Sequence, residues 1–137
     1  MKIAVVDGQG GGIGKYIVER IRKDLPCDIE IIALGTNAIA TNLMLKAGAN
    51  EGATGENAIL INILKVDLVI GTLAIVLANS MLGELTPKMA EVITTCKAPK
   101  LLLPMHKTNN IIVGIQALPI PHAIDIVINE IRKKMEV

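Results

Sequence analysis

The first 35 residues constrain the fold more than any other part of the chain. Residues 2–7 (KIAVVD) form a short apolar, mostly β-branched run that ends at a cluster of glycines, which is typical of a buried parallel strand. Apolar residues then recur at helical spacing up to Leu25, and Pro26 ends the pattern. Residues 29–34 (IEIIAL) form a second apolar run that stops at Gly35. This order predicts a right-handed βαβ unit.

The chain continues to alternate between helical and extended patterns after this unit. Asn37 is a typical N-terminal cap and Gly48 a typical stop for the helix between them. The polar stretch 48–57 is predicted to be a loop, in which Thr54 caps the next helix over 59–64.

Further elements are predicted in the middle of the chain. Residues 66–71 (VDLVIG) predict a third strand. Residues 73–83 predict a buried helix, although an apolar run this short also fits a strand. Thr86 followed by Pro87 begins another helix, because a cap followed by proline favours that start.

Two more strands and a helix are predicted near the C-terminus. Residues 100–104 (KLLLP) and 111–115 (IIVGI) are the fourth and fifth predicted strands. The segment between them is too short for a parallel crossover, so we expect a hairpin or an edge position. A last helix over 124–135 has an apolar stripe and a basic end. The whole pattern predicts one Rossmann-like α/β domain over 1–137: three layers, with a mostly parallel sheet of about five strands and helices on both faces.

The composition excludes several classes of protein. Hydrophobic residues make up 51% of the chain and charged residues 20%, which excludes a disordered polypeptide. The net charge is +1 and Tyr16 is the single aromatic residue, so a nucleic-acid partner is not expected. The longest uncharged stretch, 68–83, is shorter than the roughly 20 residues of a bilayer span. We therefore expect a cytoplasmic protein with no membrane partner.

The glycine-rich stretch Gly8–Gly14 (GQGGGIG) carries the clearest chemical signal. Glycines between a strand and a helix allow a ligand to approach the backbone and expose N–H groups at the positive helix end, as phosphate binding requires. The dinucleotide pattern G-x-G-x-x-G does not fit, because its last glycine would fall on Ile13 or Lys15. A P-loop is excluded by Gln9 and Tyr16 at its required positions.

The spacing that does fit is G-x-x-x-G-x-G, which resembles the cofactor loop of the short-chain dehydrogenases. The resemblance covers only the first βαβ unit. Those enzymes use a Tyr-x-x-x-Lys pair, whereas Tyr16 is followed four positions later by Arg20. The acidic residue that would bind a ribose after the second strand is also missing, since Leu34 leads into Gly35 and Thr36. Hydride-transfer machinery is therefore not recognisable.

Ligands of open α/β sheets bind outside the carboxyl ends of the strands, and this rule gathers the candidate binding residues. They are Asp7, Gly8, Gln9, Gly10, Gly11, Gly12, Gly14, Thr36, Asn37, Gly71 and Thr72. The expected ligand is a phosphate-bearing small molecule, with NAD(P) or another nucleotide as the possible cofactor. Another anion, or a loop that only packs the helix on the strand, stays open. Asp7 would repel a bare phosphate unless it turns toward a cation, a ribose or an amino group.

Two other functions remain open. A small transferase, isomerase or reductase would use Asp7, Glu51 and His106 together in one cavity. A structural subunit would use the apolar excess to form a homodimer or a higher homo-oligomer. No metal site is predicted, because Cys27 and Cys96 have no partners at zinc-ligand spacing.

Four stretches carry a resemblance over nearly the whole chain: residues 1–15 (MKIAVVDGQGGGIGK), 33–41 (ALGTNAIAT), 48–57 (GANEGATGEN) and 78–84 (ANSMLGE). In these stretches the chain is similar to an uncharacterised bacterial family of short proteins that is known only as a domain of unknown function. The resemblance implies a Rossmann-like fold and no established activity.

Overall fold

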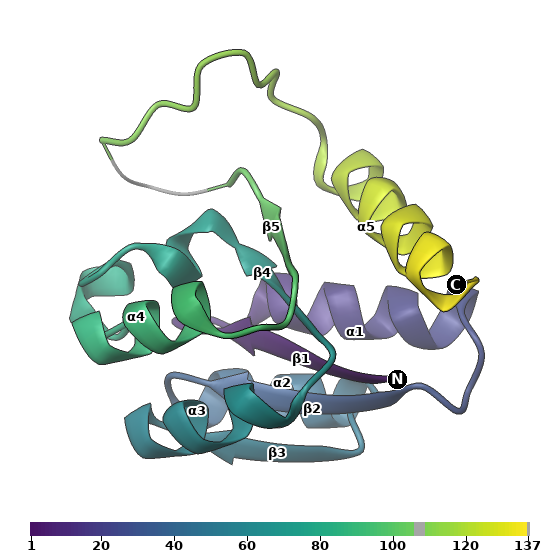
Figure 1. Ribbon diagram of the computed structural model, residues 1–137, viewed down its shortest axis with the longest axis horizontal. Helices are drawn as coiled ribbons and strands as arrows, with labels where there is room; N and C mark the ends of the chain where they lie inside the picture. The colour runs from purple at the N-terminus through teal and green to yellow at the C-terminus, as the bar shows by residue number, and fades with distance from the viewer. Residues whose placement is uncertain (106–108, 137) are drawn as a thin grey trace.

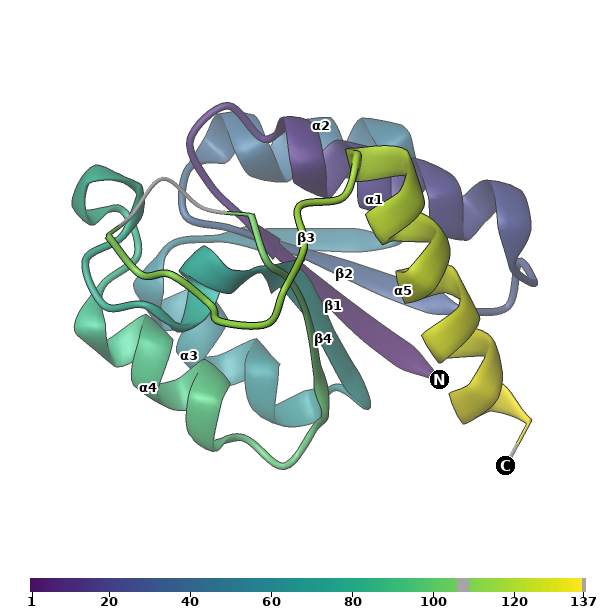
Figure 2. The same cartoon turned by 90° about the horizontal axis from the view of Figure 1, so that it is seen from above.

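A computed structural model describes residues 1–105 and 109–136. Its centre is an all-parallel five-stranded sheet in the order β3-β2-β1-β4-β5 (Figures 1 and 2). The strands are β1 (Lys2–Asp7), β2 (Glu30–Gly35), β3 (Glu51–Thr54), β4 (Leu68–Thr72) and β5 (Lys100–Leu103). Strand β1 pairs with β2 from Lys2 opposite Glu30 to Asp7 opposite Gly35. The Rossmann-like α/β architecture predicted from the sequence is thus confirmed.

Helices cover both faces of the sheet (Figure 1). One face carries α1 (Gly12–Asp24), α2 (Ala38–Ala47) and α5 (Ile120–Met135), and the other carries α3 (Glu56–Asn62) and α4 (Pro87–Thr95). Short 3-10 helices lie at Ile63–Lys65, Leu73–Val76 and Met81–Gly83. No helix among the described residues is both long enough and apolar enough to cross a bilayer.

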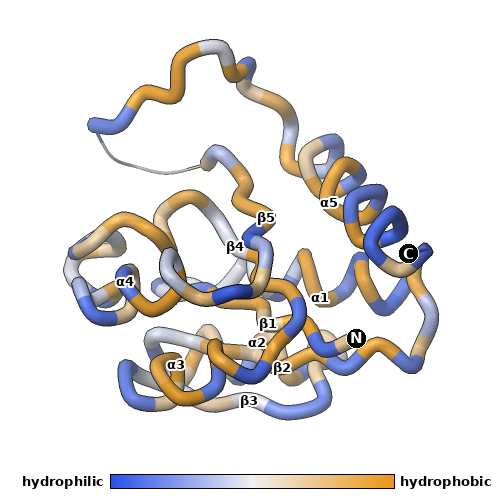
Figure 3. The backbone as a smooth tube through the Cα atoms, viewed as in Figure 1, coloured by the Kyte–Doolittle hydropathy of each residue, from blue (hydrophilic) through white to orange (hydrophobic). Residues whose placement is uncertain are grey.

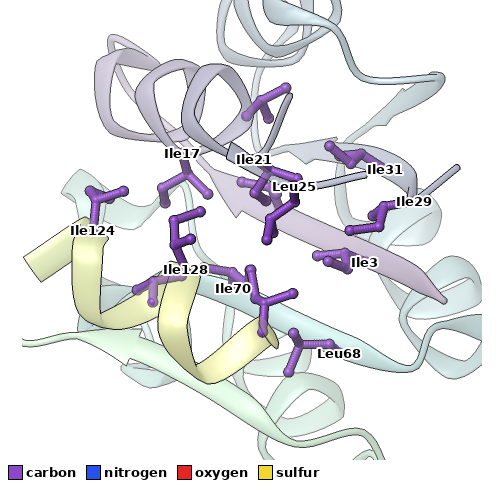
Figure 4. Close-up of a cluster of buried hydrophobic side chains, with 14 of the residues drawn as sticks. Ile3, Ile17, Ile21, Leu25, Ile29, Ile31, Leu68, Ile70, Ile124 and Ile128 are labelled. Carbon is purple, nitrogen blue, oxygen red and sulfur yellow. The ribbon is translucent and has the colours of Figure 1, made fainter. Parts of the chain in front are cut away.

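The apolar strands are continuous because the sheet is buried on both sides. In β1, Ile3 and Val5 pack toward α1 and α5, whereas Ala4 and Val6 pack toward α3 and α4. Figure 4 shows the first of these clusters, in which α1 and α5 contribute Ile17 and Ile128 above the sheet.

Helix α5 is fixed on α1 by apolar and charged contacts. Ile124 and Ile128 are buried in the cluster that also contains Ile17. At the surface, Arg20 Nη2 donates to Asp125 Oδ1 over 2.6 Å, which links the two helices. Helix α5 also forms one wall of the groove described below.

The predicted caps of α2 and α4 are confirmed. The Asn37 side chain accepts a hydrogen bond from the N–H of Ala40 at 2.9 Å. Thr86 accepts one from the N–H of Met89 at 3.2 Å, and Pro87 occupies the first turn as expected.

The prediction of a loop over 48–57 is wrong, because this stretch contains the edge strand β3. The strand pairs through its backbone with β2, from Glu51 opposite Ile32 to Thr54 opposite Gly35. An exposed edge strand needs no apolar run, so the hydrophobic pattern of the sequence does not reveal this polar strand. Thr54 lies in the strand and bonds Thr41 through its hydroxyl at 2.8 Å, and Gly55 occupies the cap position of α3.

Two further predictions about secondary structure are corrected. Residues 73–83 contain two separate 3-10 helices instead of one buried helix. Asn79, which lies between them, has a positive φ, as do Met81 and Leu82 at the start of the second. Residues 111–115 are not a strand: they lie in an exposed, irregular segment, 109–119, that leads to α5. The prediction that this segment forms a hairpin with β5 is therefore wrong. The segment has the apolar pattern of a strand, but it pairs with no strand of the sheet.

Ile17→Ala should lower the free energy of unfolding by about 2–5 kcal/mol, because it leaves a cavity between α1 and the sheet. Ile17 is 1% exposed. The matched control is Ile39→Ala on α2, where the side chain is 67% exposed and the expected change is below about 0.5 kcal/mol. Urea unfolding of both variants measures the difference, and equal losses would contradict the assigned core.

Candidate functional site

The strand order reverses between β1 and β4, which makes their carboxyl ends the switch point of the sheet. An open groove of about 1790 Å³ begins there and extends past β5 to α5. Its polar end is formed by the chain from Asp7 to Ile13, together with Tyr16 and Thr72. Of the predicted binding residues, the groove is lined by Asp7, Gly8, Gln9, Gly10, Gly11, Gly12 and Thr72.

Asp7 turns toward the backbone of the glycine loop. Its Oδ1 accepts from the N–H of Gly8 at 2.8 Å and its Oδ2 from the N–H of Gly14 at 2.7 Å. The residue is 8% exposed. Gly11, the residue at the cap position of α1, has no side chain that could cap the helix. The Asp7 carboxylate instead accepts the hydrogen bond from the third N–H of the helix, that of Gly14.

Burial raises the pKa of Asp7, because desolvation disfavours the charged carboxylate. The N–H groups of Gly14 and Gly8 oppose this shift, and the negative charge of Glu84 adds to it. The repulsion between Asp7 and a phosphate that the sequence suggested is reduced by this arrangement, since both carboxylate oxygens are held by the loop itself.

Backbone donors remain at the groove end of α1. The N–H of Gly11 donates to the carbonyl of Gly8 at 3.0 Å. Gly12 and Ile13 occupy the first two helical positions, where an N–H has no acceptor within the helix. These two N–H groups lie at the positive end of the helix dipole and beside the groove, which is the arrangement that favours an anion.

Gly8 and Gly14 are required by packing. A Cβ on Gly14 would lie 2.7 Å from Sδ of Met44 and 2.8 Å from Cβ of Asp7. A Cβ on Gly8 would collide with the Thr36 hydroxyl. These two positions therefore fit the view that the loop packs the helix against the strand.

Gly10 and Gly12 have no such requirement. Both are exposed to the groove, and a Cβ on either would meet nothing within 4 Å. Neither has a positive φ, whereas Gly11 between them does, at 73°. Packing therefore explains why positions 8 and 14 are glycine, but it does not explain why the two positions that border the open space, 10 and 12, are glycine as well.

Glu84 fixes the other side of the loop. Its Oε1 accepts from the Gln9 N–H at 2.9 Å, the Thr36 hydroxyl at 2.7 Å and the Asn37 amide at 2.8 Å. The bond from Asn37, followed by those from Gln9 and Thr36, lowers the pKa of Glu84. Thr36 and Asn37 thus lie on the β2 side of the loop and hold the loop through Glu84, outside the groove lining.

Sequence reasoning did not include Glu84 among the binding residues, because it lies far along the chain from both the glycine loop and the end of β2, which it joins. The only signal for it is that stretch 78–84, which follows an apolar run, contains three polar residues, Asn79, Ser80 and Glu84. The same stretch holds Met81 and Leu82 with φ of 55° each, a left-handed conformation that is costly for large side chains.

Thr72 ends β4 on the opposite side of the switch point. It is 8% exposed, lines the groove, and has no hydrogen-bond partner for its hydroxyl within residues 1–105 and 109–136. Gly71 before it is not part of the lining. A Cβ there would lie 2.9 Å from the carbonyl oxygen of Val6, so this glycine allows β4 and β1 to pack closely.

The prediction that Asp7, Glu51 and His106 cluster in one cavity is wrong, because the carboxylates of Asp7 and Glu51 lie far apart. Glu51 lies at the start of β3, where it forms an ion pair with Lys2 at 2.8 Å. Asp7 lies at the end of β1, three residues further along and two strands away, or about 14 Å by strand geometry. His106 lies outside the described residues, as do Lys107 and Thr108.

The groove has little charge of its own apart from the loop. Lys100 is the one basic residue in its lining from the described part of the chain, and its ammonium donates to the carbonyl of Cys96 at 2.5 Å. Within the same residues, no three side chains of the metal-binding types lie together. An anion in this groove would therefore depend on backbone N–H groups and on the helix dipole.

Comparison with known proteins places the chain in one family. The DUF3842 family, a domain of unknown function, matches residues 2–136, and the chain belongs to it. The relationship inferred from the sequence is confirmed. Neither the curated proteins nor the solved structures contain a match to the chain.

Gly14→Ala should destabilise the fold by about 1–3 kcal/mol, because its methyl group would overlap Met44 and Asp7. Gly12→Ala should leave the stability equal or slightly raised, since its methyl group meets open space and alanine favours a helix. Urea unfolding of the two variants provides the test. A large loss at Gly12 would show that packing governs this position too.

Glu84→Gln should make the fold less sensitive to acid. Because the pKa of Glu84 is lowered in the folded state, the stability from its ionised form is present above the ordinary pKa and is lost as pH falls through the folded pKa. Asp7 acts in the opposite sense: its raised pKa gives a contribution that is present at low pH and is lost as pH rises through the folded pKa.

The measurement is the free energy of unfolding at several pH values between about 7 and 3, where these carboxyl groups titrate. Glu84→Gln should flatten the curve, and Asp7→Asn should steepen the loss in acid. Parallel curves for all three proteins would contradict the assigned contacts.

Proposed function

We propose that this member of the DUF3842 family binds a phosphate-bearing small molecule, with its anionic group at the N–H groups of Gly12 and Ile13, beside Gly10. The observation that carries the proposal is the division of the glycine loop. Gly8 and Gly14 are required by packing, but Gly10 and Gly12 border open space and have no packing reason to lack a side chain. Close approach of a ligand to the backbone supplies that reason.

The surroundings of the loop support an anion. The first N–H groups of α1 point out of a helix of thirteen residues, and their partial positive charge is not neutralised by Asp7, which is bound to Gly8 and Gly14. Glu84 is held away from the groove lining by Gln9, Thr36 and Asn37. The loop is thus already ordered before a ligand arrives, which lowers the entropic cost of binding.

Hydride transfer is not part of the proposal. In the usual arrangement a dinucleotide places its adenosine ribose over the end of the second strand. Here Glu84 and Met81 pack over that end, and a Cβ on Gly8 would meet both. The free space lies on the side of β4 and β5. This asymmetry favours a phosphate ligand other than NAD(P), bound on the β4 side.

Gly12→Ala should weaken phosphate binding at least about tenfold without lowering stability, because the methyl group would occupy the space beside the N–H donors. Titration of 15N-labelled protein with inorganic phosphate and with AMP measures the affinity from shifts of the loop amides. Asn57→Ala, an exposed position on α3, is the matched control and should bind as the unmodified chain does. An unchanged affinity in Gly12→Ala, or no shift of the Gly10, Gly12 and Ile13 amides in the unmodified chain, would contradict the proposal.

A further inference from the structure

We propose that the ligand is a phosphate ester of an extended aliphatic group, with the phosphate at the glycine loop and the aliphatic group in the groove between β5 and α5. This inference rests on the proposed function and names the chemical class of its ligand. It is carried by the lining of the groove beyond the loop, by the hydroxyl of Thr72, and by the near absence of aromatic residues.

The groove beyond the loop is apolar. From β5 it is lined by Leu101 and Leu103, and from α5 by Val127. Segment 109–119 supplies the remaining wall, with Ile115 at 54% exposed and Leu118 at 44%. Figures 1 and 3 show this segment as a largely hydrophobic arch between β5 and α5.

Exposed apolar side chains gather in this region more than elsewhere. Eight of the fourteen large hydrophobic residues that are exposed lie between residues 111 and 135 of the described chain. Six of these eight line the groove, all but Val113 and Met135. Scattered exposed hydrophobic residues need no explanation, but a set gathered along one groove is typical of a surface that binds an apolar partner.

Thr72 supplies a polar contact where the two parts of the groove meet. It ends β4, the strand next to β1, while β5 follows on its other side. Its side chain is more than nine-tenths buried and lines the groove, and its hydroxyl has no partner among residues 1–105 and 109–136. Among the described residues no buried side-chain oxygen lacks a partner, so this hydroxyl is open to the groove, where a phosphate or ester oxygen of the ligand would accept its hydrogen bond.

The lining favours an aliphatic group over a nucleoside. Tyr16 is the single aromatic residue of the whole chain, and it lies at the loop end of the groove. A base in the distal part would have no aromatic side chain to stack on, and its polar edges would face leucine and isoleucine. A hydrocarbon chain buries its surface there without leaving polar atoms unpaired.

The experiment is a calorimetric titration of the full chain with butyl, hexyl and octyl phosphate below their micellar concentrations. Inorganic phosphate, AMP and 1-octanol are titrated in parallel. Affinity for the alkyl phosphates should rise about two- to fourfold per added methylene, as expected for burial of a hydrocarbon chain. Octyl phosphate should bind at least tenfold more tightly than either inorganic phosphate or 1-octanol.

Three variants separate the two ends of the ligand. Thr72→Val, which keeps the shape of the side chain, should weaken all alkyl phosphates by about tenfold without changing the dependence on chain length. Ile115→Lys, at an exposed position, should remove that dependence while leaving the affinity for inorganic phosphate unchanged. Ile39 on α2 is 67% exposed and lies outside the groove, so Ile39→Lys should leave both the chain-length dependence and the affinity for inorganic phosphate unchanged.

Each contrary result has a distinct meaning. If alkyl phosphates bind no better than inorganic phosphate, or if AMP binds more tightly than octyl phosphate, the aliphatic ligand is wrong and phosphate binding at the loop stands. If 1-octanol binds as tightly as octyl phosphate and Gly12→Ala has no effect, the phosphate site is wrong as well. If light scattering finds a dimer that Ile115→Lys dissociates and no ligand shows chain-length dependence, a second copy covers the groove and the inference is overturned.

Discussion

The carboxylate of Asp7 is the contact on which the site depends, because it joins the end of β1 to the start of α1. Two backbone N–H groups, from Gly8 and Gly14, offset the cost of burying its charge. In the loop held this way Gly8 and Gly14 are buried, whereas Gly10 and Gly12 are exposed at the groove. One buried acid thus determines which N–H groups of the loop are used by the protein and which are available to a ligand.

Glu84 makes the site asymmetric. It binds Gln9, Thr36 and Asn37 and so connects the loop to the end of β2. The two acids respond to their surroundings in opposite ways, since burial raises the pKa of Asp7 and hydrogen bonds lower that of Glu84. Because the β2 side is filled by the protein's own chain, only the β4 side has room for a ligand.

The sequence predicts the fold well where apolar periodicity reports burial. The βαβ unit, the parallel sheet and the caps at Asn37 and Thr86 follow from local patterns. The same criterion fails for β3, which is an exposed strand held by backbone pairing. It also fails for 111–115, where the apolar pattern of a strand occurs in an exposed segment.

The candidate site shows the same division. Strand ends and glycines are visible in the sequence, so the loop and Thr72 could be predicted at the groove. The direction of a side chain is not visible, so the inward turn of Asp7 could not. Nor could the contact of Glu84 with Thr36, which joins residues 48 positions apart. Glu51 was misplaced because its strand was missed, and with it the end of the sheet on which it lies.

The apolar segment 109–119 is better explained by a groove than by an extension of the sheet. Strand β5 has an open edge, but it is only four residues long, begins with Lys100 and is followed by Pro104, features that discourage pairing with another strand. Ile115 and Leu118 instead line the same hollow as Leu101 and the glycine loop. The proposed ligand would bury these two side chains with its apolar part and place its anionic part at the N–H groups at the far end of the hollow. A molecule with both properties satisfies the two ends of the groove at once.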